Sequence, residues 1–448
     1  AMKNSTSRTY HRMPGARTAA RVALAVALVA QAPSLALGAE PVARASQLLP
    51  DSQALRTWLH GHQLQIAVLK AKNREAVAAT RDARLLPNPV LTLGVAGIAL
   101  GNRNPRGLSW TDTQNYQATL TETIELGKRS HRIRSADLHA QSTELESIQG
   151  EGALVADARE GLARLVYLNE RKRVLEERLQ SARAIVALDQ VRLDRGDVSG
   201  IDHNRLLLDV ANVERELADN ANELASAQTD CAVALGSACE PDVSADQLEA
   251  LLPPIAVGIA ERFDPAVRPD IRSLHAEAAA QQEQAQLFAN RAIPDPVVGV
   301  SYVHDNLTAA GNQPHTLGVS VSIPLPVSDR GQHQRAEALA RAEQAEAQAH
   351  VTERAVTEQV RSLARTEQIT FEKLTKLKNQ AFPLAVGVLD ATERAYRLGQ
   401  VSMTDLLLAR RQRGELALDL VDTRFALFGI RSQMLRALGV DAAGVERQ

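Results

Sequence analysis

The sequence predicts an α+β membrane protein in which two copies of one structural unit follow each other along 448 residues. Three observations predict this class: short segments that alternate between polar and apolar residues, long stretches almost free of Gly and Pro, and anchor segments that recur. Only 3% of the residues are aromatic, which argues against large globular cores. The net charge of −2 gives no basic surface for nucleic acid.

Residues 1–38 have the pattern of a secretory signal peptide. Basic residues precede the apolar run VALAVALVA at 22–30, and small residues at 36–38 would permit cleavage. The apolar run is too short to span a bilayer. An exported chain meets oxidising conditions, so Cys231 and Cys239 either form a disulfide that closes a small loop or remain two unpaired thiols.

The internal repeat is clearest at two short turns. RGDVSGID at 195–202 matches LGQVSMTD at 398–405, and their glycines are 399 − 196 = 203 residues apart. In the same order, LLPNPVL at 85–91 pairs with AIPDPVV at 292–298. Ordered anchors at nearly one spacing indicate a long-period repeat. The predicted boundaries are a first repeat at 39–250, a linker or equatorial segment at 251–267 and a second repeat at 268–448.

Each repeat reads helix, strand, strand, long helix, turn, helix. In TLGVSVSI at 316–323 the large apolar residues share one face, and Thr, Gly and Ser share the other. The predicted strands are at about 88–100, 115–126, 296–304 and 315–325. The predicted helices after them are at about 129–193, 203–235, 332–398 and 405–438. At ~1.5 Å per residue the two long helices would each reach roughly 100 Å, and Pro383 should kink the second.

Four alternating strands with one apolar face cannot stand alone in a membrane. Strands of about 10 residues suit a tilted bilayer crossing. A four-stranded sheet has two open edges, however, which lipid does not tolerate, and four strands are too few to close a barrel. We therefore expect several chains to pool their strands. The alternative is a soluble four-stranded sheet with one face on a core.

The order of these segments resembles the outer membrane factor family, the TolC-like channels of Gram-negative efflux and secretion systems. The residues that carry the resemblance are the two turns, LPNP (86–89), IELGKRSHRI (124–133), IPDP (293–296) and IPLPVSDRGQHQRAEA (323–338). The resemblance covers about 45–440 and implies a homotrimer, with a twelve-stranded outer membrane β-barrel continuous with a long periplasmic α-helical barrel. The segment ETIELGKRSHRIRSAD at 122–137 is similar to the CzcC-like heavy-metal branch.

The family implies a passive exit duct in a tripartite efflux system. Substrate from an RND-type inner membrane pump would reach the duct through a periplasmic adaptor protein, with heavy-metal cations favoured over drugs or secreted proteins. A soluble periplasmic coiled-coil adaptor or scaffold is the alternative class. No HExxH, GxSxG, P-loop or CxxC motif occurs in the sequence, so we expect no enzyme, no metal site and no cofactor.

The resemblance also gives the two turns a role. In the family such turns form the periplasmic tip and contact the adaptor, whereas ordinary helix-hairpin chemistry explains the same residue types, since Gly permits a tight reversal. The expected adaptor-docking residues are Gly196, Val198, Ser199, Gly399, Val401 and Ser402.

Three residues near the turns correspond to the gate and aperture of the family. Tyr396 matches the gate tyrosine, Asp202 matches its partner on the neighbouring hairpin, and Asp405 matches the acidic ring of the aperture. A hydrogen bond between a phenol and a carboxylate is a breakable latch worth roughly 1–3 kcal/mol. The alternative is that both Asp residues cap the helices that follow the turns.

Overall fold

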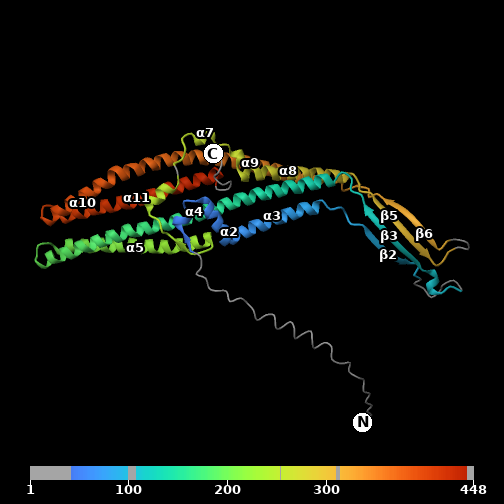
Figure 1. Cartoon of the computed structure of the whole chain (residues 1–448), viewed down its shortest axis with the longest axis horizontal. Coiled ribbons are helices and arrows are strands. Elements are labelled where there is room, and N and C mark those ends of the chain that lie inside the picture. Colours follow the sequence, from blue (N-terminus) through green and yellow to red (C-terminus); the bar gives the residue numbers. More distant parts are fainter. Residues whose placement is uncertain (1–41, 99–106, 253, 309–312, 441–448) are drawn as a thin grey trace, which may run out of the picture. The chain divides into compact units, whose positions relative to one another are not determined.

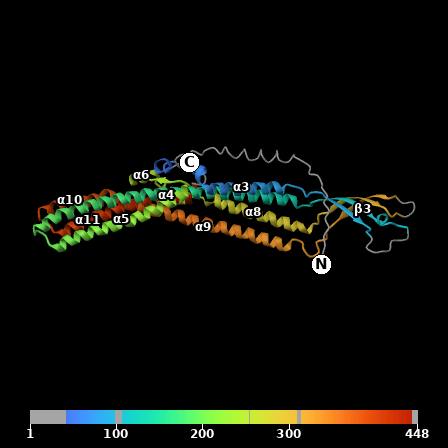
Figure 2. The ribbon, with the colours of Figure 1, turned by 90° about the horizontal axis from the view of Figure 1, so that it is seen from below.

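The computed structural model describes residues 42–98, 107–252, 254–308 and 313–440. The predicted signal peptide at 1–38 and parts of both strand-connecting loops lie outside these residues. Figures 1 and 2 show the four-stranded sheet at one end of the long helices and the two helix reversals at their other end. Within the described part of the chain, no helix combines the length and the apolar character that a membrane span requires.

The four strands form one antiparallel sheet in the order β2–β3–β5–β6. Their bounds are β2 (Val90–Ala96), β3 (Asn115–Thr123), β5 (Val297–Asp305) and β6 (His315–Ser322). Strands β2 and β6 are shorter than predicted, and β5 begins one residue later than predicted; a proline adjoins each of these ends. Pro89 and Pro296 directly precede β2 and β5, and Pro324 lies just beyond the end of β6. Strand pairing stops at these ends because proline has no N–H to donate to a ladder.

The strand register gathers the apolar side chains on one face of the sheet. Leu93 lies opposite Ala118, Ala118 opposite Tyr302 and Tyr302 opposite Leu317, so one row of this face crosses all four strands. The adjacent row of paired residues points to the other face of the sheet. It consists of Thr92, Thr119, Ser301 and Gly318. Leu317 and Val319 are each 79% exposed and Leu93 is 73% exposed. A single chain therefore leaves a continuous apolar face uncovered.

Helices occupy most of the remaining chain, in the same order in each half. The main helices are α2 (Ser52–His62), α3 (Leu64–Ala83), α4 (Arg129–Asp194), α5 (Gly200–Leu235), α8 (Pro269–Ala289), α9 (Gln332–Lys376), α10 (Phe382–Arg397) and α11 (Met403–Ala437). Helix α4 packs against α3, α5 and α8, and α9 packs against α8 and α11. The 66 residues of α4 correspond to about 100 Å of helix.

Alanine allows α8 and α9 to lie close together. Ala338, Ala342, Ala345 and Ala349 of α9 are buried, and their spacing of four, three and four residues follows the heptad repeat of a coiled coil. Helix α8 contributes Ala276, Ala278, Ala280 and Ala285 as buried residues. Small side chains at these positions let long helices pack side by side without a wide core between them.

The second long helix changes its hydrogen-bonding pattern just before Pro383. The segment η4 (Leu377–Ala381) is a π-helical turn, and Pro383 stands at the start of α10. Proline lacks an N–H and its ring crowds the carbonyl four residues earlier. A π-helical turn widens the helix at this point, and so accommodates the break that the sequence predicts at Pro383.

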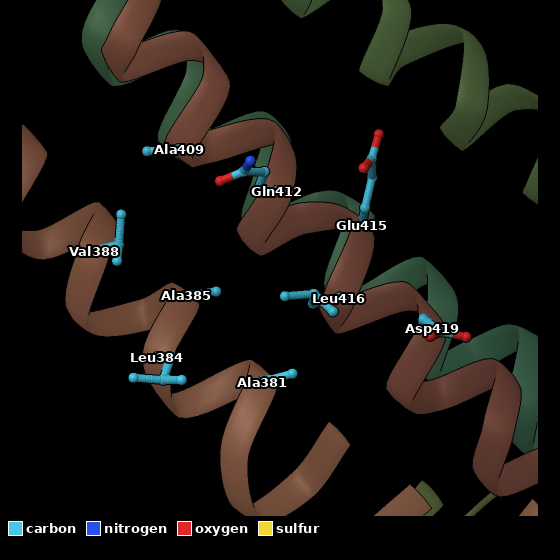
Figure 3. A pocket seen from close by; sticks show the side chains of 9 residues that line it. All are labelled: Ala381, Leu384, Ala385, Val388, Ala409, Gln412, Glu415, Leu416 and Asp419. Carbon is cyan, nitrogen blue, oxygen red and sulfur yellow. The ribbon is translucent and has the colours of Figure 1, made fainter. Parts of the chain in front are cut away.

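Next to this turn, α10 and α11 enclose an open groove of about 480 Å³ (Figure 3). Small and aliphatic side chains face it from α10, among them Leu384 and Val388. Two carboxylates line the α11 side, and both are ion-paired. Glu415 lies 2.8 Å from Arg411, and Asp419 lies 2.6 Å from Lys373. The groove thus presents mainly apolar surface rather than a group of free polar side chains.

A run of short elements joins the two halves, from the end of the predicted first repeat through the predicted linker at 251–267. It contains β4 (Cys239–Glu240), α6 (Ala245–Leu251), α7 (Ile259–Arg262) and the 3₁₀ turn η2 (Pro265–Val267). Strand β1 (Ala43–Arg44), followed by α1 (Ala45–Leu48), pairs in parallel with β4. A buried apolar cluster surrounds this region and includes Leu55, Leu59, Leu162, Leu165, Leu235 and Leu248. Helix α6 contributes Leu248 to this cluster, whereas Ile259 of α7 packs against a second buried cluster that contains Val356, Val360 and Met434.

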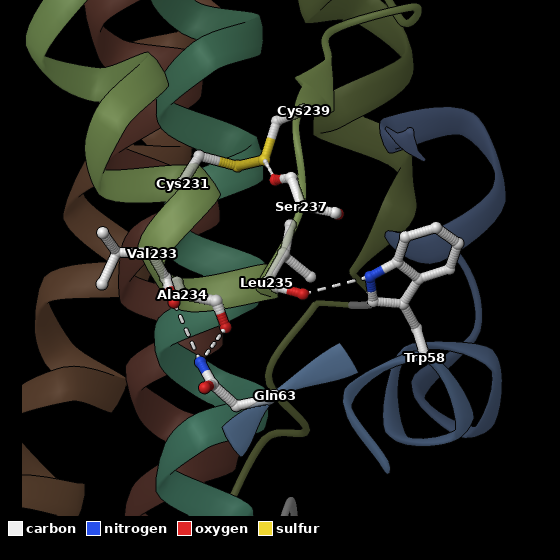
Figure 4. Close-up of a disulfide and its surroundings, with 8 residues drawn as sticks. All are labelled: Trp58, Gln63, Cys231, Val233, Ala234, Leu235, Ser237 and Cys239. Carbon is white, nitrogen blue, oxygen red and sulfur yellow. Dashed lines mark hydrogen bonds between the residues drawn. A yellow bond between two sulfur atoms is a disulfide. The ribbon is translucent and has the colours of Figure 1, made fainter. Parts of the chain in front are cut away.

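A disulfide joins Cys231 of α5 to Cys239 of β4 (Figure 4). Two side chains from the N-terminal region hold the C-terminal end of α5 beside it. Trp58 Nε1 donates to the Leu235 carbonyl at 3.3 Å, and Gln63 Nε2 donates to the Val233 and Ala234 carbonyls. These carbonyls have no partner within the helix, so the side chains supply the hydrogen bonds that its last turn lacks.

Replacing both Cys231 and Cys239 with Ala should lower the midpoint of thermal unfolding. A bridge between residues eight positions apart stabilises the folded chain by about 2–3 kcal/mol, because it restricts the unfolded chain. Circular dichroism of the mature protein in detergent would measure the change. Dithiothreitol should produce a similar loss in the natural protein and none in the double variant; equal midpoints in both proteins would contradict a stabilising bridge.

Candidate gate and docking tips

Both helix reversals close with the same backbone motif. Gly196 has φ = +79° and Gly399 has φ = +72°, and each follows the last turn of a long helix. The closing hydrogen bonds run from Asp197 N to Arg192 O and from Gln400 N to Ala395 O, each 2.9 Å. This pattern is the Schellman motif, which requires a left-handed residue that Gly adopts without steric strain. The shared sequence of the two turns therefore has a shared backbone cause.

The residues after each glycine begin the next helix in the same way. Ser199 Oγ accepts from the Asp202 N–H at 3.1 Å, and Ser402 Oγ accepts from the Asp405 N–H at 3.2 Å. The Asp405 carboxylate in turn accepts from the Ser402 N–H at 3.1 Å, which completes a capping box. Asp202 also accepts from Arg205 at 3.1 Å. Asp405 therefore completes a helix cap, whereas the Asp202 carboxylate bonds to the Ser199 hydroxyl and to Arg205.

The cap also keeps Asp405 charged. The hydrogen bonds that its carboxylate receives from the Ser402 side chain and N–H lower the pKa of Asp405. Asp405 is exposed in the single chain, so it places a negative charge at the tip at neutral pH. This charge is compatible with the acidic ring that the family resemblance implies, because capping uses the carboxylate without neutralising it.

The predicted docking residues differ in exposure. Gly196, Ser199, Gly399 and Ser402 are exposed, whereas Val198 and Val401 are half-buried. Val401 packs against the buried cluster of the tip, which contains Leu206, Tyr396, Met403 and Leu406. The tips therefore present a surface of small residues on a rigid apolar base.

Tyr396 lies in this cluster and hydrogen-bonds to a residue that sequence reasoning missed. Its hydroxyl donates to Asp189 Oδ1 of α4 at 3.0 Å. The other carboxylate oxygen, Oδ2, lies 3.2 Å from Nδ1 of His203 on α5. Asp189 is fully buried, and Tyr396 and His203 are only 5% and 7% exposed. One carboxylate thus connects α4, α5 and α10.

The structure does not bring Tyr396 to Asp202 within one chain. The described hydrogen bonds of the Asp202 side chain run to Ser199 and Arg205. Asp202 is the third residue of α5, where its carboxylate serves the start of the helix, and His203 comes one position later, on a different side of the helix. A pairing of Tyr396 with Asp202 across chains stays a prediction.

The contact between Asp189 and His203 could have been predicted from their positions relative to the turn. Asp189 precedes Gly196 by 196 − 189 = 7 residues, and His203 follows it by 203 − 196 = 7 residues. Residues equidistant from a tight reversal face each other across an antiparallel pair of helices. An acid and a histidine in such positions indicate a contact, although their burial and the approach of Tyr396 depend on the tertiary fold.

The surroundings of Tyr396 keep its hydroxyl protonated. Burial, the hydrogen bond to Asp189 and the charge of that carboxylate raise the pKa of Tyr396 to about 12. The Arg192 guanidinium lies 4.8 Å from the centre of the tyrosine ring and opposes this shift. Tyr396 therefore remains a hydrogen-bond donor throughout the physiological pH range.

The described residues include no group of three or more His, Cys, Asp or Glu side chains that is placed to hold a metal ion. His residues instead form pairs with carboxylates between helices. His131 lies 2.6 Å from Glu283, and His139 lies 2.8 Å from Glu277. The hydrogen bond to Glu277 raises the pKa of His139, so this pair binds a proton more readily than a free imidazole does.

Comparison with known proteins relates this geometry to a function. No family model matches the sequence. The chain is 24% identical over 358 residues to the cobalt-zinc-cadmium resistance protein CzcC of Cupriavidus metallidurans, and the match covers 80% of each protein.

Solved structures share the fold. CusC, described for its folding and transmembrane channel formation, superposes with a TM-score of 0.74 at 17% identity and covers 87% of this chain and 92% of its own. The outer-membrane channel OprN superposes with a TM-score of 0.70 at 18% identity and covers 90% and 93%. The predicted localisation in the outer membrane agrees with the description of OprN as an outer-membrane channel. The chain thus has the fold of these channels, and the predicted resemblance to the outer membrane factor family is confirmed.

Proposed function

We propose that this protein is the outer membrane channel of a tripartite efflux system, a passive exit duct that extends into the periplasm. The observation that carries this proposal is the exposed apolar face of a sheet whose two edge strands, β2 and β6, have no partner within the described chain. In water such a face and such edges favour aggregation. In an outer membrane, three chains would join their edges into a closed barrel and turn their apolar faces toward lipid.

The helices give this barrel its extension. Helix α4 alone spans about 100 Å, and the tips lie at the end of the helices opposite the sheet (Figure 1). A barrel in the outer membrane would therefore hold the tips deep in the periplasm. This placement supports contact with a periplasmic adaptor and, beyond it, an RND-type inner membrane pump. We infer no chemistry for the duct itself.

Divalent heavy-metal cations are the proposed substrate. The support is the sequence similarity to a protein named for cobalt, zinc and cadmium resistance. The exposed, anionic Asp405 of three chains would favour cations at the aperture. Leu408, one turn later, adds no second acidic ring, so the proposed selection of cations at the tip is weak. Drugs and secreted proteins are the alternative cargo.

The tips and Tyr396 are the proposed moving and docking parts. The turns carry the residues Gly196, Val198, Ser199, Gly399, Val401 and Ser402, which would meet the adaptor. The hydrogen bond from Tyr396 to Asp189 crosses from the α10–α11 hairpin to the α4–α5 hairpin. Any widening that separates these hairpins must break it, so we assign Tyr396 the role of a latch.

Replacing Val319 with Arg should reduce the amount of trimer in outer membranes. A cation on the lipid face of a barrel costs about 2–4 kcal/mol near the middle of the bilayer. The matched control is Ser320→Arg, since Ser320 is adjacent but lies on the polar face with Ser301 and Gly318. Semi-native gel electrophoresis of membrane fractions would measure both. A mature chain that is monomeric and soluble without detergent would overturn the proposal.

Replacing Gly399 with Trp should abolish efflux while trimers still assemble. Apart from its chain neighbours, no atom lies within 4 Å of a Cβ placed at this residue. The Trp side chain would therefore project outward into the proposed docking surface, although the positive φ of this residue strains it. Its matched control is Gly399→Asn, because Asn tolerates positive φ and remains small. Resistance to Co²⁺, Zn²⁺ and Cd²⁺, in cells that carry the cognate pump and adaptor, is the measurement. Normal resistance in the Trp variant would remove the docking role.

Replacing Tyr396 with Phe should raise conductance in planar lipid bilayers. The variant loses a buried hydrogen bond to a carboxylate, worth roughly 1–3 kcal/mol, and keeps the ring. Tyr167→Phe is the matched control, because Tyr167 donates to Asp422 at 2.9 Å between α4 and α11, away from the tip. A Tyr396→Phe channel with natural conductance would exclude the latch.

A further inference from the structure

We propose that His203 makes the gate sensitive to protons, so that the duct opens more readily as the pH rises. This inference rests on the latch role proposed for Tyr396 and adds its regulation. The carrying observation is that Asp189, the acceptor of the Tyr396 hydrogen bond, also contacts an imidazole, on α5. The three side chains belong to three helices and are all buried.

A fully buried carboxylate needs compensation for its lost hydration. Without a counter-charge, burial of an ionised carboxylate is strongly unfavourable. Tyr396 supplies a hydrogen bond to Asp189 but no charge, because its hydroxyl stays protonated. His203 is the side chain in contact with Asp189 that can carry a positive charge, and histidine ordinarily changes its charge between pH 5 and 8.

The other charged groups of the tip have different partners. On α4, Arg192 lies over the Tyr396 ring. On α5, Asp202 is bonded to Ser199 and Arg205. On α11, Asp405 is bonded to Ser402, and Arg410 donates to the Ser181 carbonyl.

On α10, the charged residues near Tyr396 in the sequence are Glu393 and Arg397. From α11, the apolar Met403 and Leu406 cover the cluster. Protonation of His203 is thus the change that acts directly on Asp189.

The sign follows from what opening does to Asp189. With α10 and α11 packed over it, Asp189 is fully buried; separation of the hairpins would expose it to water. When His203 is protonated, the packed arrangement contains an ion pair joined by a charge-assisted hydrogen bond. When His203 is neutral, the same arrangement keeps the Asp189 carboxylate buried without the charge-assisted bond from His203. Deprotonation of His203 therefore penalises the packed arrangement specifically, so the latch weakens as the pH rises.

The test is the conductance of the full mature channel in planar bilayers between about pH 5.5 and 8.5. The conductance of natural channels should rise at least about fivefold over this range. This factor corresponds to the difference in free energy between a charge-assisted and a neutral hydrogen bond. His203→Gln should flatten the profile, because Gln hydrogen-bonds without titrating. His139→Gln is the matched control and should keep the natural profile, since His139 pairs with Glu277 between α4 and α8.

A second variant covers the case in which His203→Gln fails to form trimers. Asp189→Asn keeps an oxygen that accepts from Tyr396 but removes the charge, so its conductance should also be independent of pH. A natural pH profile in either variant, or no pH dependence in the natural channel, would overturn the inference. These results are separable from the latch: Tyr396→Phe with natural conductance removes the latch, whereas raised conductance in Tyr396→Phe together with an unchanged profile in His203→Gln removes only proton control.

Discussion

The hydrogen bonds that β2 and β6 leave unmade at their outer edges constrain the whole molecule. Each edge strand has a row of backbone N–H and C=O groups without a partner inside the described sheet, beside an apolar face that water does not favour. Further copies of the same sheet would pair with these edges, and lipid would cover the apolar face. The proposed barrel rests on this demand of the backbone, whereas its three chains and its periplasmic duct rest on the family resemblance.

Much of the fold could be predicted from the sequence, because local residue patterns mark its strands and its long helices. Period-two alternation located the four strands, and the scarcity of Gly and absence of Pro located α4, whose observed bounds are Arg129–Asp194. The prolines beside the strands explain why pairing stops early. Helices α6 and α7 could not be predicted in the same way, because both are short and each packs against a different apolar cluster.

The tip shows where sequence reasoning reached its limit. The recurrence of Gly, Ser and Asp in both turns correctly indicated equivalent reversals, since each residue has a backbone task in a Schellman motif or a helix cap. The partner of Tyr396 was a different matter. Helical rotation decides whether Asp202 or its neighbour His203 points inward, and only packed helices reveal that the fully buried Asp189 receives both contacts.

The parallel pairing of β1 with β4 has a consequence for the order in which the chain becomes structured. Ala43 meets Cys239, a partner 239 − 43 = 196 residues later, and Trp58 and Gln63 bond to the last turn of α5. In a chain that is exported from its N-terminal end, Ala43 stays without its strand partner until Cys239 has followed it. Such distant contacts form slowly because a long loop must close first. Periplasmic chaperones would therefore meet an N-terminal segment that is still seeking its partner.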